Sequence, residues 1–529
     1  MGLKQRRKVM VPDPLRSGVP LAELLAASAS RDPQAPALVV TADRVAISYG
    51  ELVGLVDELA GQLVRGGLSS GDRVGLRAYG NAAFVVGLFA ASRAGLVVVP
   101  VDPALPISTQ RARLTAAGAR VVLVDDAAGT APAPPSWPIS VRVTAGDGTA
   151  TVELETAAAP DPTPVTPDGL RPDDAVIMFT GGTTGSPKMV PWTRDNIAGA
   201  ISGVVAAYRL GPQDATVAVM PLFHGHGLIA ALLSTLASGG CVLLPAAGRF
   251  SAHTFWDDVR AARASWFTAA PTIHRILLDR AATDYPGPAE APLRFIRSCS
   301  AALDPETARG LQAEFAAPVL SAYGMTEATH QVSSMGLSAH DFADEKAAVR
   351  TGLVGRSTGV DIRIVGDGGR MCAPDTVGEV WLRGRTIVRG YLDAAATARS
   401  FTDGWLHTGD LGSLSPNGEL TLRGRIKEMI NRGGEKISPE HVEGVLTSHP
   451  EVAEAAVFAV PDRIYGEAVA AVIVPRSATP DFSELAEFCR ERLAAFEVPA
   501  SFTAAAELPH TAKGSLDRRA VAQRFGSRT

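Results

Sequence analysis

Two histidines lie in a stretch that otherwise consists of hydrophobic residues, proline and glycine. His224 and His226 belong to PLFHGHGL, residues 221–228. Imidazoles in such a setting are either core groups whose nitrogens bind backbone carbonyls or polar groups that bind a ligand. The segment alone does not separate these interpretations, and the choice depends on the residues that surround it.

A loop rich in glycine and hydroxyl residues follows the strand-like run DDAVIMF. It offers a phosphate many backbone N–H groups, several hydroxyls and one ammonium. It is not a Walker A loop, because Pro187 precedes the lysine and Met189 stands where Ser or Thr would hold magnesium. Glycine-rich turns are common, so both a phosphate site and an ordinary turn stay open at this point. The candidate phosphate ligands are Thr180, Gly181, Gly182, Thr183, Thr184, Gly185 and Lys188.

Four further motifs follow at long separations, namely SAYGMTEATH (321–330), GWLHTGDLG (404–412), GRIKEMINRGGEKISPEHVE (424–443) and PHTAKGSLDRR (509–519). Together with the glycine loop they resemble the adenylate-forming superfamily, which includes acyl-CoA synthetases, nonribosomal adenylation domains and beetle luciferases. The resemblance covers nearly the whole chain. It implies an ATP-dependent ligase that forms an acyl-adenylate with release of pyrophosphate, and then transfers the acyl group to coenzyme A with release of AMP.

The resemblance implies phosphate and metal ligands that suit this chemistry. A carboxylate attacks the α-phosphate of ATP, so the site must supply cations and donors to the phosphoryl oxygens. Thr183 and Thr184 would hold the departing pyrophosphate, and Thr326 would hold the α-phosphate. Glu327 would ligate Mg²⁺, which prefers oxygen donors.

The same resemblance implies ligands for the adenosine part of ATP. Tyr323 would cover the adenine, with Gly324 beside it, and Asp410 and Arg425 would bind the ribose hydroxyls. Without the resemblance, Asp410 in HTGDLG is simply a turn residue.

Two lysines are implied to serve the two half-reactions. Lys513 would bridge the substrate carboxylate and the phosphate during adenylation, since an ammonium can neutralise both. Lys427 stands at the hinge about which a terminal domain would swing between an adenylating and a thioester-forming pose. That swing would bring the NRGGEKIS loop to the thiol tunnel, and the coenzyme A ligands there would be Gly433, Gly434 and Lys436.

The acyl pocket of such enzymes is lined by the segment that here carries His224 and His226. Ser298 and Ser300 in RSCSAAL, and His330 after MTEAT, fall on the same pocket by motif position. A long alkyl chain would leave these groups unpaired, at a cost of roughly 1 to 3 kcal/mol each. The pocket is therefore expected to hold a small polar acid.

Several local strings, including PLFHGHGL, WFTAAPTIHRILLDR and MTEATHQ, resemble the oxalyl-CoA synthetase (oxalate:CoA ligase) branch. Histidine and serine donors can hold the second carboxylate of oxalate next to the reacting one. Alternatives are a medium- or long-chain fatty acyl-CoA synthetase, a carrier-loading adenylation domain and a non-catalytic nucleotide sensor. Chain-length preference, dependence on a carrier protein and pyrophosphate release distinguish them.

Composition agrees with an enzyme that acts on small molecules. The chain has 529 residues, 46% hydrophobic and 20% charged, and a net charge of −5, which argues against nucleic-acid binding. Its four cysteines are scattered and indicate neither disulfides nor zinc. No apolar tract is long enough to span a membrane, and no signal peptide is apparent, so a cytoplasmic location is expected. The sequence does not indicate the oligomeric state.

The elements that must position these residues follow an α/β pattern. Helical and strand-like runs alternate from about residue 48, and the rhythm returns in VLLPAAG, FWDDVRAARASWFTAAP and HRILLDRAA. Residues 127–169 are rich in Pro, Ala, Thr and Gly, and are expected to be a surface excursion, partly ordered at best. Short glycine-punctuated runs past residue 355 predict a small β subdomain.

We therefore predict an α/β fold with two domains. Residues 1–424 would form a large domain of two α/β halves and the β subdomain, which binds AMP. Residues 425–529, with alternating helix and strand patterns, would form a small mobile α+β domain.

Overall fold

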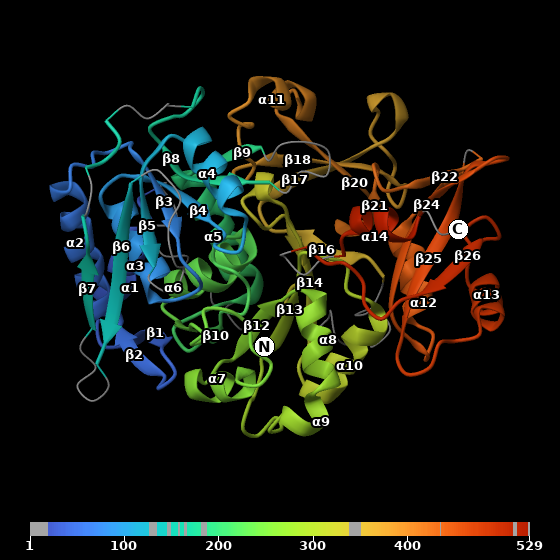
Figure 1. The fold of residues 1–529 in the computed structure, drawn as a ribbon, viewed down its shortest axis with the longest axis horizontal. Coiled ribbons are helices and arrows are strands. Elements are labelled where there is room, and N and C mark those ends of the chain that lie inside the picture. Colours follow the sequence, from blue (N-terminus) through green and yellow to red (C-terminus); the bar gives the residue numbers. More distant parts are fainter. Residues whose placement is uncertain are drawn as a thin grey trace, which may run out of the picture.

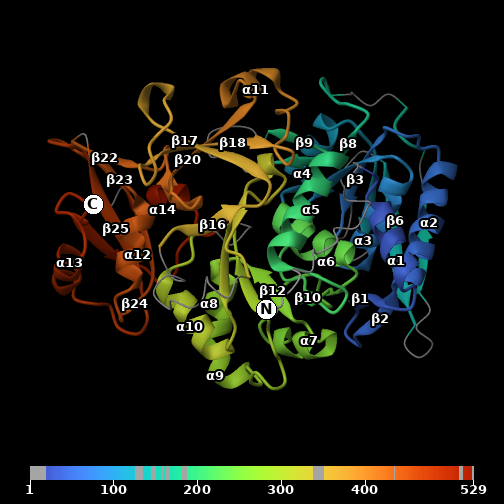
Figure 2. The same ribbon diagram turned by 180° about the vertical axis from the view of Figure 1, so that it is seen from behind.

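A computed structural model gives the fold, and it describes residues 19–125, 135–144, 150–156, 159–162, 167–180, 188–337, 351–433, 435–511 and 516–526. Within these ranges the strands form three sheets. The first sheet lies at one end of the long axis, the carboxy-terminal sheet lies at the other, and the second sheet lies between them (Figure 1). Figure 2 shows the same order from behind.

The first sheet has the strand order β7-β6-β5-β3-β4-β8-β9. Its centre is parallel, and the antiparallel pairs β6/β7 and β8/β9 form its two edges. Every residue of β4, VVVPV, is buried, because side chains on both faces of the strand join hydrophobic clusters. The strands are β3 (Arg73–Arg77), β4 (Val97–Val101), β5 (Ala119–Asp125), β6 (Ser136–Val143), β7 (Ala150–Leu154), β8 (Asp174–Phe179) and β9 (Met189–Thr193).

The second sheet has the order β17-β18-β20-β21-β16-β15-β14-β13-β12-β10-β11-β1-β2, with β19 paired to β20. Strands β1 and β10 to β14 pair in parallel, and the section from β15 to β21 is antiparallel. The strands are β1 (Pro36–Val40), β2 (Val45–Ser48), β10 (Ala215–Val217), β11 (Cys241–Leu243), β12 (Trp266–Ala269), β13 (Phe295–Ser298), β14 (Val319–Tyr323), β15 (Ser333–Ser334), β16 (Leu353–Ser357), β17 (Val360–Val365), β18 (Gly378–Gly384), β19 (Phe401–Thr402), β20 (Trp405–Leu414) and β21 (Glu419–Arg425).

The third sheet belongs to the carboxy-terminal part and has the order β23-β22-β25-β24, with β26 paired to β25. Two hydrophobic clusters pack against it, and both are made only from residues after Lys427. The predicted boundary at residue 425 falls between β21 and this sheet and stays a prediction. The strands are β22 (Ile430–Arg432), β23 (Glu435–Ile437), β24 (Val452–Asp462), β25 (Gly466–Pro475) and β26 (Ser501–Ala504).

The helices begin where the sequence offers capping groups. Ser48 and Glu51 form a capping box at the start of α2, and Asn81 accepts a backbone hydrogen bond at the start of α3. The helices are α1 (Ala22–Arg31), α2 (Tyr49–Arg65), α3 (Ala82–Arg93), α4 (Ile107–Ala116), α5 (Arg194–Tyr208), η3 (His226–Leu233), α6 (Ser234–Ser238), α7 (Phe255–Ala262), α8 (Pro271–Asp279), α9 (Ala281–Asp284), α10 (Pro305–Phe315), η4 (Thr326–Ala328), η5 (Asp367–Gly369), α11 (Ala394–Ser400), α12 (Pro439–Thr447), α13 (Phe482–Arg490) and α14 (Arg518–Phe525).

The predicted α/β fold is confirmed, with one correction and one refinement. Residues 127–169 are not only a surface excursion, because β6 and β7 extend the first sheet and bury Trp137 and Ile139 completely. The strands predicted past residue 355 are present, but they join the second sheet through β15 rather than forming a sheet of their own. Strand β15 is only Ser333–Ser334, too short for a periodic signal.

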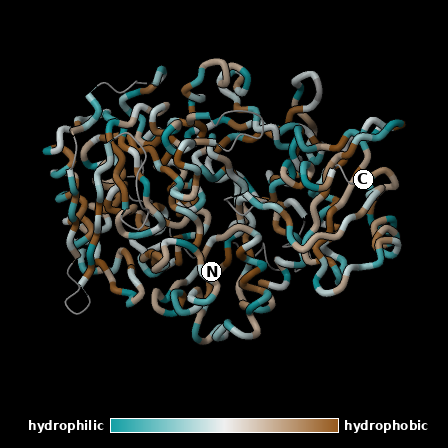
Figure 3. Tube along the Cα trace, viewed as in Figure 1, coloured by the Kyte–Doolittle hydropathy of each residue, from teal (hydrophilic) through white to brown (hydrophobic). Residues whose placement is uncertain are grey.

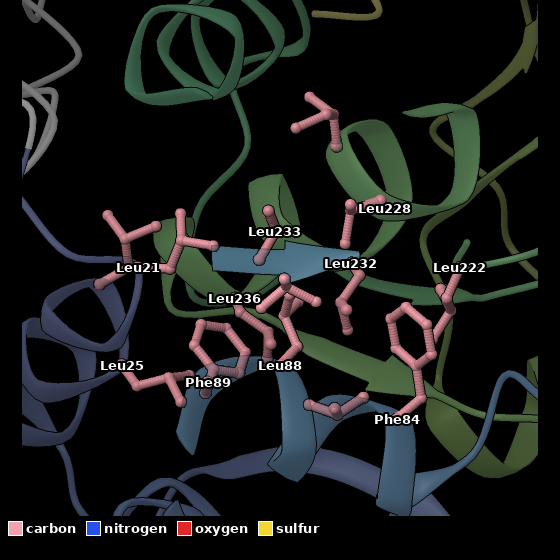
Figure 4. Close-up of a cluster of buried hydrophobic side chains, with 14 of the residues drawn as sticks. Leu21, Leu25, Phe84, Leu88, Phe89, Leu222, Leu228, Leu232, Leu233 and Leu236 are labelled. Carbon is pink, nitrogen blue, oxygen red and sulfur yellow. The ribbon is translucent and has the colours of Figure 1, made fainter. Parts of the chain in front are cut away.

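A core between the first two sheets fixes the segment that carries the histidines. Phe84 and Leu88 of α3 belong to the same hydrophobic cluster as Leu228 and Leu232 of η3, and Figure 4 shows Leu232 on the side toward α3. Helix η3 is a π-helix, a wide form that is often found at functional sites, and it begins at His226. Burial of its apolar residues therefore holds His226 at the start of a packed helix.

Hydrophobic residues line the inner strands of each sheet, and hydrophilic residues occupy most of the outer turns (Figure 3). Among the residues that the structure describes, no helix is both long and apolar enough to cross a membrane.

Candidate active site

The polar residues of interest gather at the carboxyl ends of neighbouring parallel strands. Thr268 lies in β12, Arg297 is paired with it in β13, and Tyr323 ends β14. Parallel strands place their carboxyl ends at one edge of a sheet, which is where ligands bind in open α/β folds. The segments that follow these strands, with Ser300 and His330, reach the same edge.

Tyr323, Asp410 and Arg425 form one hydrogen-bonded group. The Tyr323 hydroxyl donates to Oδ2 of Asp410, and Nε of Arg425 lies 2.8 Å from Oδ1 of the same carboxylate. Strands β20 and β21 place Asp410 directly opposite Arg425. Burial raises the pKa of Asp410, while the Arg425 charge opposes that rise. The group offers a carboxylate acceptor, a cation and an aromatic ring at one place.

Glu327 lies in the short 3₁₀ helix η4 and is 8% exposed. The Tyr391 hydroxyl donates to its Oε1 atom over 2.7 Å, and the other carboxylate oxygen makes no hydrogen bond within the described part of the chain. Nζ of Lys188 lies 4.2 Å from the centre of the Tyr391 ring, a cation–π contact. Burial and the neighbouring Glu327 charge raise the pKa of Tyr391. Tyr391, which the sequence did not single out, therefore connects Glu327 to Lys188.

The neck of the glycine loop is closed by its two ends. The Thr180 amide donates to the Lys188 carbonyl over 3.1 Å, and the Lys188 amide donates to the Thr180 hydroxyl over 3.3 Å. The loop thus starts and ends at the β8/β9 edge, whose strands pair up to Phe179 and Met189. The candidates Gly181, Gly182, Thr183, Thr184 and Gly185 lie outside the described residues.

His226, Ser300 and His330 are brought together as predicted. Nδ1 of His226 lies 2.9 Å from the Ser300 hydroxyl, and its Nε2 lies 2.6 Å from the Thr268 hydroxyl. The His226 and His330 rings stack with their centres 5.3 Å apart and an angle of 18° between their planes. Both Ser300 (φ 77°) and His330 (φ 84°) adopt left-handed backbone conformations. Such conformations are unfavourable for these residues and are typical of functional sites.

Arg297 lies behind both imidazoles and was not singled out from the sequence. Its side chain is completely buried, with 0% exposure. Its Nη1 atom donates to Nε2 of His226 over 3.2 Å and to Thr268 over 2.9 Å, and its Nη2 atom donates to Nε2 of His330 over 3.0 Å. The available signal was a charged residue inside FIRS, an otherwise buried strand.

Burial and the arginine together account for the protonation of both rings. Burial lowers the pKa of His226 and of His330 well below the usual value, and the Arg297 charge lowers both further. Both imidazoles are therefore neutral at neutral pH. Because a guanidinium only donates, each Nε2 atom must accept, and the proton of each ring resides on Nδ1.

The other predicted site residues occupy varied places. His224 is partly exposed and packs edge-on against Phe223, with ring centres 4.9 Å apart. Ser298 is 2% exposed, and its hydroxyl has no hydrogen-bond partner within the described residues. Thr326 accepts a hydrogen bond at its carbonyl from Trp192 over 2.8 Å.

The predicted hinge and coenzyme A residues lie beyond β21. Lys427 is exposed in the turn between β21 and β22. The Gly433 amide donates to the Tyr465 carbonyl over 2.8 Å at the tip of the β22/β23 hairpin. Gly434 and Lys513 lie outside the described residues, as does the side chain of Lys436.

Comparison with protein families gives two matches. The family described as AMP-binding enzyme matches residues 25–392, and the AMP-binding enzyme C-terminal domain matches residues 441–515. Together they include most of the site residues described above.

Similar proteins include two CoA ligases and a solved structure. The chain is 40% identical to an oxalate–CoA ligase of Arabidopsis thaliana over 96% of this chain and 98% of that protein. It is 34% identical to a sulfoacetate–CoA ligase of Cupriavidus necator over 94% and 96% of the two chains. The crystal structure of ATP-bound MatB from Rhodopseudomonas palustris superposes with a TM-score of 0.80 and 27% identity, over 96% of this chain and 99% of that one.

Proposed function

The chain belongs to the AMP-binding enzyme family, and we propose that it joins oxalate to coenzyme A through an oxalyl-adenylate. The general class is an ATP-dependent, AMP-forming acid:CoA ligase. In the first step a carboxylate oxygen attacks the α-phosphorus of ATP and pyrophosphate leaves. In the second the thiolate of coenzyme A attacks the carbonyl carbon and AMP leaves.

The observation that carries the choice of acid is the group of polar side chains at the expected acyl pocket. His226, Ser300 and His330 converge there, with Arg297 behind them. An alkyl chain would leave these groups without partners, at a cost of roughly 1 to 3 kcal/mol each. Both named relatives act on acids that carry a second anionic group, oxalate and sulfoacetate. Oxalate therefore fits better than a fatty acid.

For the nucleotide, the proposal assigns adenosine to the group around Asp410. The carboxylate would accept hydrogen bonds from the ribose hydroxyls, and Arg425 would hold that carboxylate ionised. Tyr323 would cover the adenine, with Gly324 beside it. Thr326, with the glycine loop and Lys188, would bind the phosphates.

For magnesium, Glu327 is a suitable ligand by its chemistry. One of its oxygens is occupied by Tyr391 and the other is without a hydrogen bond within the described residues, so a hard oxygen donor is available. No group of three or more acidic, histidine or cysteine ligands occurs within the described part of the chain. Mg²⁺ would thus be held by Glu327 together with phosphate oxygens and water, and it would neutralise phosphate charge.

For the two half-reactions, the proposal keeps the roles that the motifs imply. Lys513 would neutralise charge between carboxylate and phosphate in the first half-reaction. A rotation about Lys427 would then move Lys513 out of the active site and bring in the hairpin with Gly433, Gly434 and Lys436, which would contact coenzyme A.

The experiment that tests the function is release of AMP with coenzyme A across a panel of acids: oxalate, malonate, sulfoacetate, acetate, hexanoate and palmitate. We expect the highest kcat/KM for oxalate, and thioester formation should require both ATP and Mg²⁺. A preference for hexanoate or palmitate would contradict the assignment of the acid. Absence of pyrophosphate release with every acid would contradict the ligase activity itself.

A further inference from the structure

Arg297 is a buried cation whose hydrogen bonds are all made to neutral groups. Nε donates to the Tyr208 hydroxyl over 2.9 Å, and Nη2 donates to Oε1 of Gln331 over 2.9 Å, in addition to the bonds to Thr268 and the two histidines. All five N–H groups are thereby occupied. No carboxylate in the described part of the chain forms an ion pair with this guanidinium.

Neutral acceptors satisfy the hydrogen bonds of a buried guanidinium but leave its charge uncompensated. Burial of a charge is costly unless an opposite charge lies nearby. A buried carboxylate nearby follows this rule, since Asp214 is paired with the partly exposed Arg294. At Arg297 the compensating charge has to come from outside the described protein residues, and an anionic ligand would supply it.

The hydrogen bonds of Arg297 also set the direction of the network around it. Nε2 of His226 accepts from Arg297 and carries no proton, so the Thr268 hydroxyl, which also accepts from Arg297, donates to this nitrogen. The proton of the ring is then on Nδ1, and His226 donates from Nδ1 to Ser300. The Ser300 hydroxyl proton is then left for another acceptor, and Ser300 is exposed. Nδ1 of His330 has no hydrogen-bond partner within the described residues and is not sealed from solvent.

We propose that Arg297 is a positioning residue that determines specificity: its fork holds His226 and His330 as neutral Nδ1–H donors, and its charge selects an acid that carries a second negative group. The inference rests on the proposed function only in taking oxalate as that acid. Arg297 itself does not touch the substrate, because all of its donors are used within the protein.

Charged and titratable groups face the two imidazoles from each packed element. Arg297 is the guanidinium among them. The titratable groups are His224 before η3, His274 of α8, Tyr208 of α5 and Cys299 after β13. Replacement of Arg297 therefore removes the cation that opposes protonation of both rings.

The first measurement concerns the free protein. Imidazole nitrogen NMR on ¹⁵N-histidine-labelled enzyme, with His226→Gln and His330→Gln to assign the signals, should show Nδ1–H and unprotonated Nε2 for both rings. A proton on Nε2 of either ring would overturn the proposal. No acid is present in this measurement, so it decides the tautomers even if the enzyme proves to prefer another acid.

The second measurement compares Arg297→Met with wild type using oxalate and acetate. We expect KM for oxalate to rise about tenfold to a hundredfold, as for loss of charge-assisted contacts, with a much smaller change for acetate. Because burial still lowers the pKa of both rings in the variant, oxalate affinity should return only at pH values below about 6.5, the usual imidazole pKa, as imidazolium restores positive charge. Wild type should show no such gain.

Two further variants separate charge from geometry. Arg297→Lys keeps a cation but has no fork, so we expect an intermediate KM for oxalate without the rescue at low pH. Arg275→Met is the matched control, because Arg275 lies in neighbouring α8 and pairs with Asp304 at 3.5 Å. Its kinetics should stay within about twofold of wild type.

A purely structural role would give a different pattern. Thermal unfolding and an unchanged affinity for ATP would show that Arg297→Met is folded. If this folded variant keeps the wild-type KM for oxalate, the proposal is wrong. The same holds if its defect in oxalate KM stays constant at every acidic pH at which the variant remains folded. If Arg297→Met does not fold, Arg297→Lys and the NMR measurement still decide.

Discussion

His226 illustrates how single residues acquire a function from their partners. Its ring is buried between a serine at the pocket and an arginine behind it, and both nitrogens are engaged. A core histidine bound to backbone carbonyls would have neither contact. The two histidines of PLFHGHGL also differ from each other, since His224 is partly exposed and packs against Phe223. We therefore expect substitutions of His224 and of His226 to have different effects on activity.

The first prediction concerns the side chains at the acyl pocket. Ser300→Ala and His330→Ala should each lower kcat/KM for oxalate by roughly tenfold to a hundredfold, because a hydrogen bond to a charged group contributes about 1.5 to 3 kcal/mol. His224→Ala should lower turnover with oxalate and acetate alike. Steady-state kinetics with both acids provide the comparison, and KM for ATP serves as the control. Unchanged oxalate kinetics in Ser300→Ala and His330→Ala would show that neither side chain binds the acid.

At the level of elements, strand ends and tight turns bring the two halves of the site together. The chain leaves β14 at Tyr323, passes through η4 and returns to β15 within ten residues. This compact return places Tyr323, which we propose to bind the nucleotide, and His330, which we propose to line the acyl pocket, on one short segment. It also forces a close backbone approach, since a Cβ atom at Gly324 would lie 1.4 Å from the His330 carbonyl oxygen.

The second prediction follows from this approach. Gly324→Ala should lower the free energy of unfolding by about 1 to 3 kcal/mol, because the clash is with backbone and the turn must shift. The shift should also displace His330, so oxalate use should fall more than acetate use. Urea denaturation and kinetics measure the two effects. Gly54→Ala in α2, where a Cβ meets nothing within 4 Å, is the control and should stabilise by about 0.5 to 1 kcal/mol.

The third prediction concerns the base of the segment that carries Lys513. His510 and Leu516 form a bridge there, and Nε2 of His510 lies 2.6 Å from Oε1 of Glu454. This hydrogen bond raises the pKa of His510. A raised pKa in the folded state means that the pair stabilises fully below about pH 6.5, the unfolded value, and that this contribution is lost as pH rises through the folded value.

Denaturation of wild type and His510→Gln across this range checks the sign. The difference in unfolding free energy should be largest in mild acid and should shrink in mild alkali, and Glu454→Gln should show the same trend. A difference that does not vary with pH would exclude an ionised His510–Glu454 pair.

At the scale of the whole molecule, the carboxy-terminal part is held together by its own contacts. Arg518 binds Glu428 over 2.6 Å and Glu443 over 2.5 Å, and both acids follow Lys427 in the chain. The segment that carries Lys513 is thus tied to groups on its own side of the predicted hinge. A rotation at Lys427 would carry Lys513 with the third sheet.

The fourth prediction tests the two poses. Lys513→Ala should abolish formation of the acyl-adenylate yet still convert supplied acyl-adenylate and coenzyme A to thioester, because the lysine serves only one pose. Lys427→Pro, which restricts the backbone at the hinge, should show the opposite pattern. Pyrophosphate release and thioester formation are measured separately. Equal loss of both half-reactions in folded Lys513→Ala would contradict the two-pose assignment.

The sequence by itself determined much of the fold and part of the site. Hydrophobic periodicity predicted the alternation of helix and strand from about residue 48, where α2, β3, α3 and β4 lie, because this signal is local. The ordered motifs indicated the family and the candidates at Tyr323, Glu327 and Asp410. The pairing of β6 and β7 was missed because their composition favours loops, and only the neighbouring strand β5 supplies a partner.

Only the tertiary structure decided how the polar residues act together. Arg297, Thr268 and Tyr391 belong to none of the motifs. Arg297 contacts residues that are 29 to 71 positions away in the sequence, and Tyr391 contacts Glu327, which is 64 positions away. A tautomer depends on which donor reaches which nitrogen, and a pKa depends on burial and nearby charge. These are properties of packed neighbours. Residue types could therefore name His226 and His330 as candidates, whereas their neutral, donating state follows from their burial and from the guanidinium that the fold places behind them.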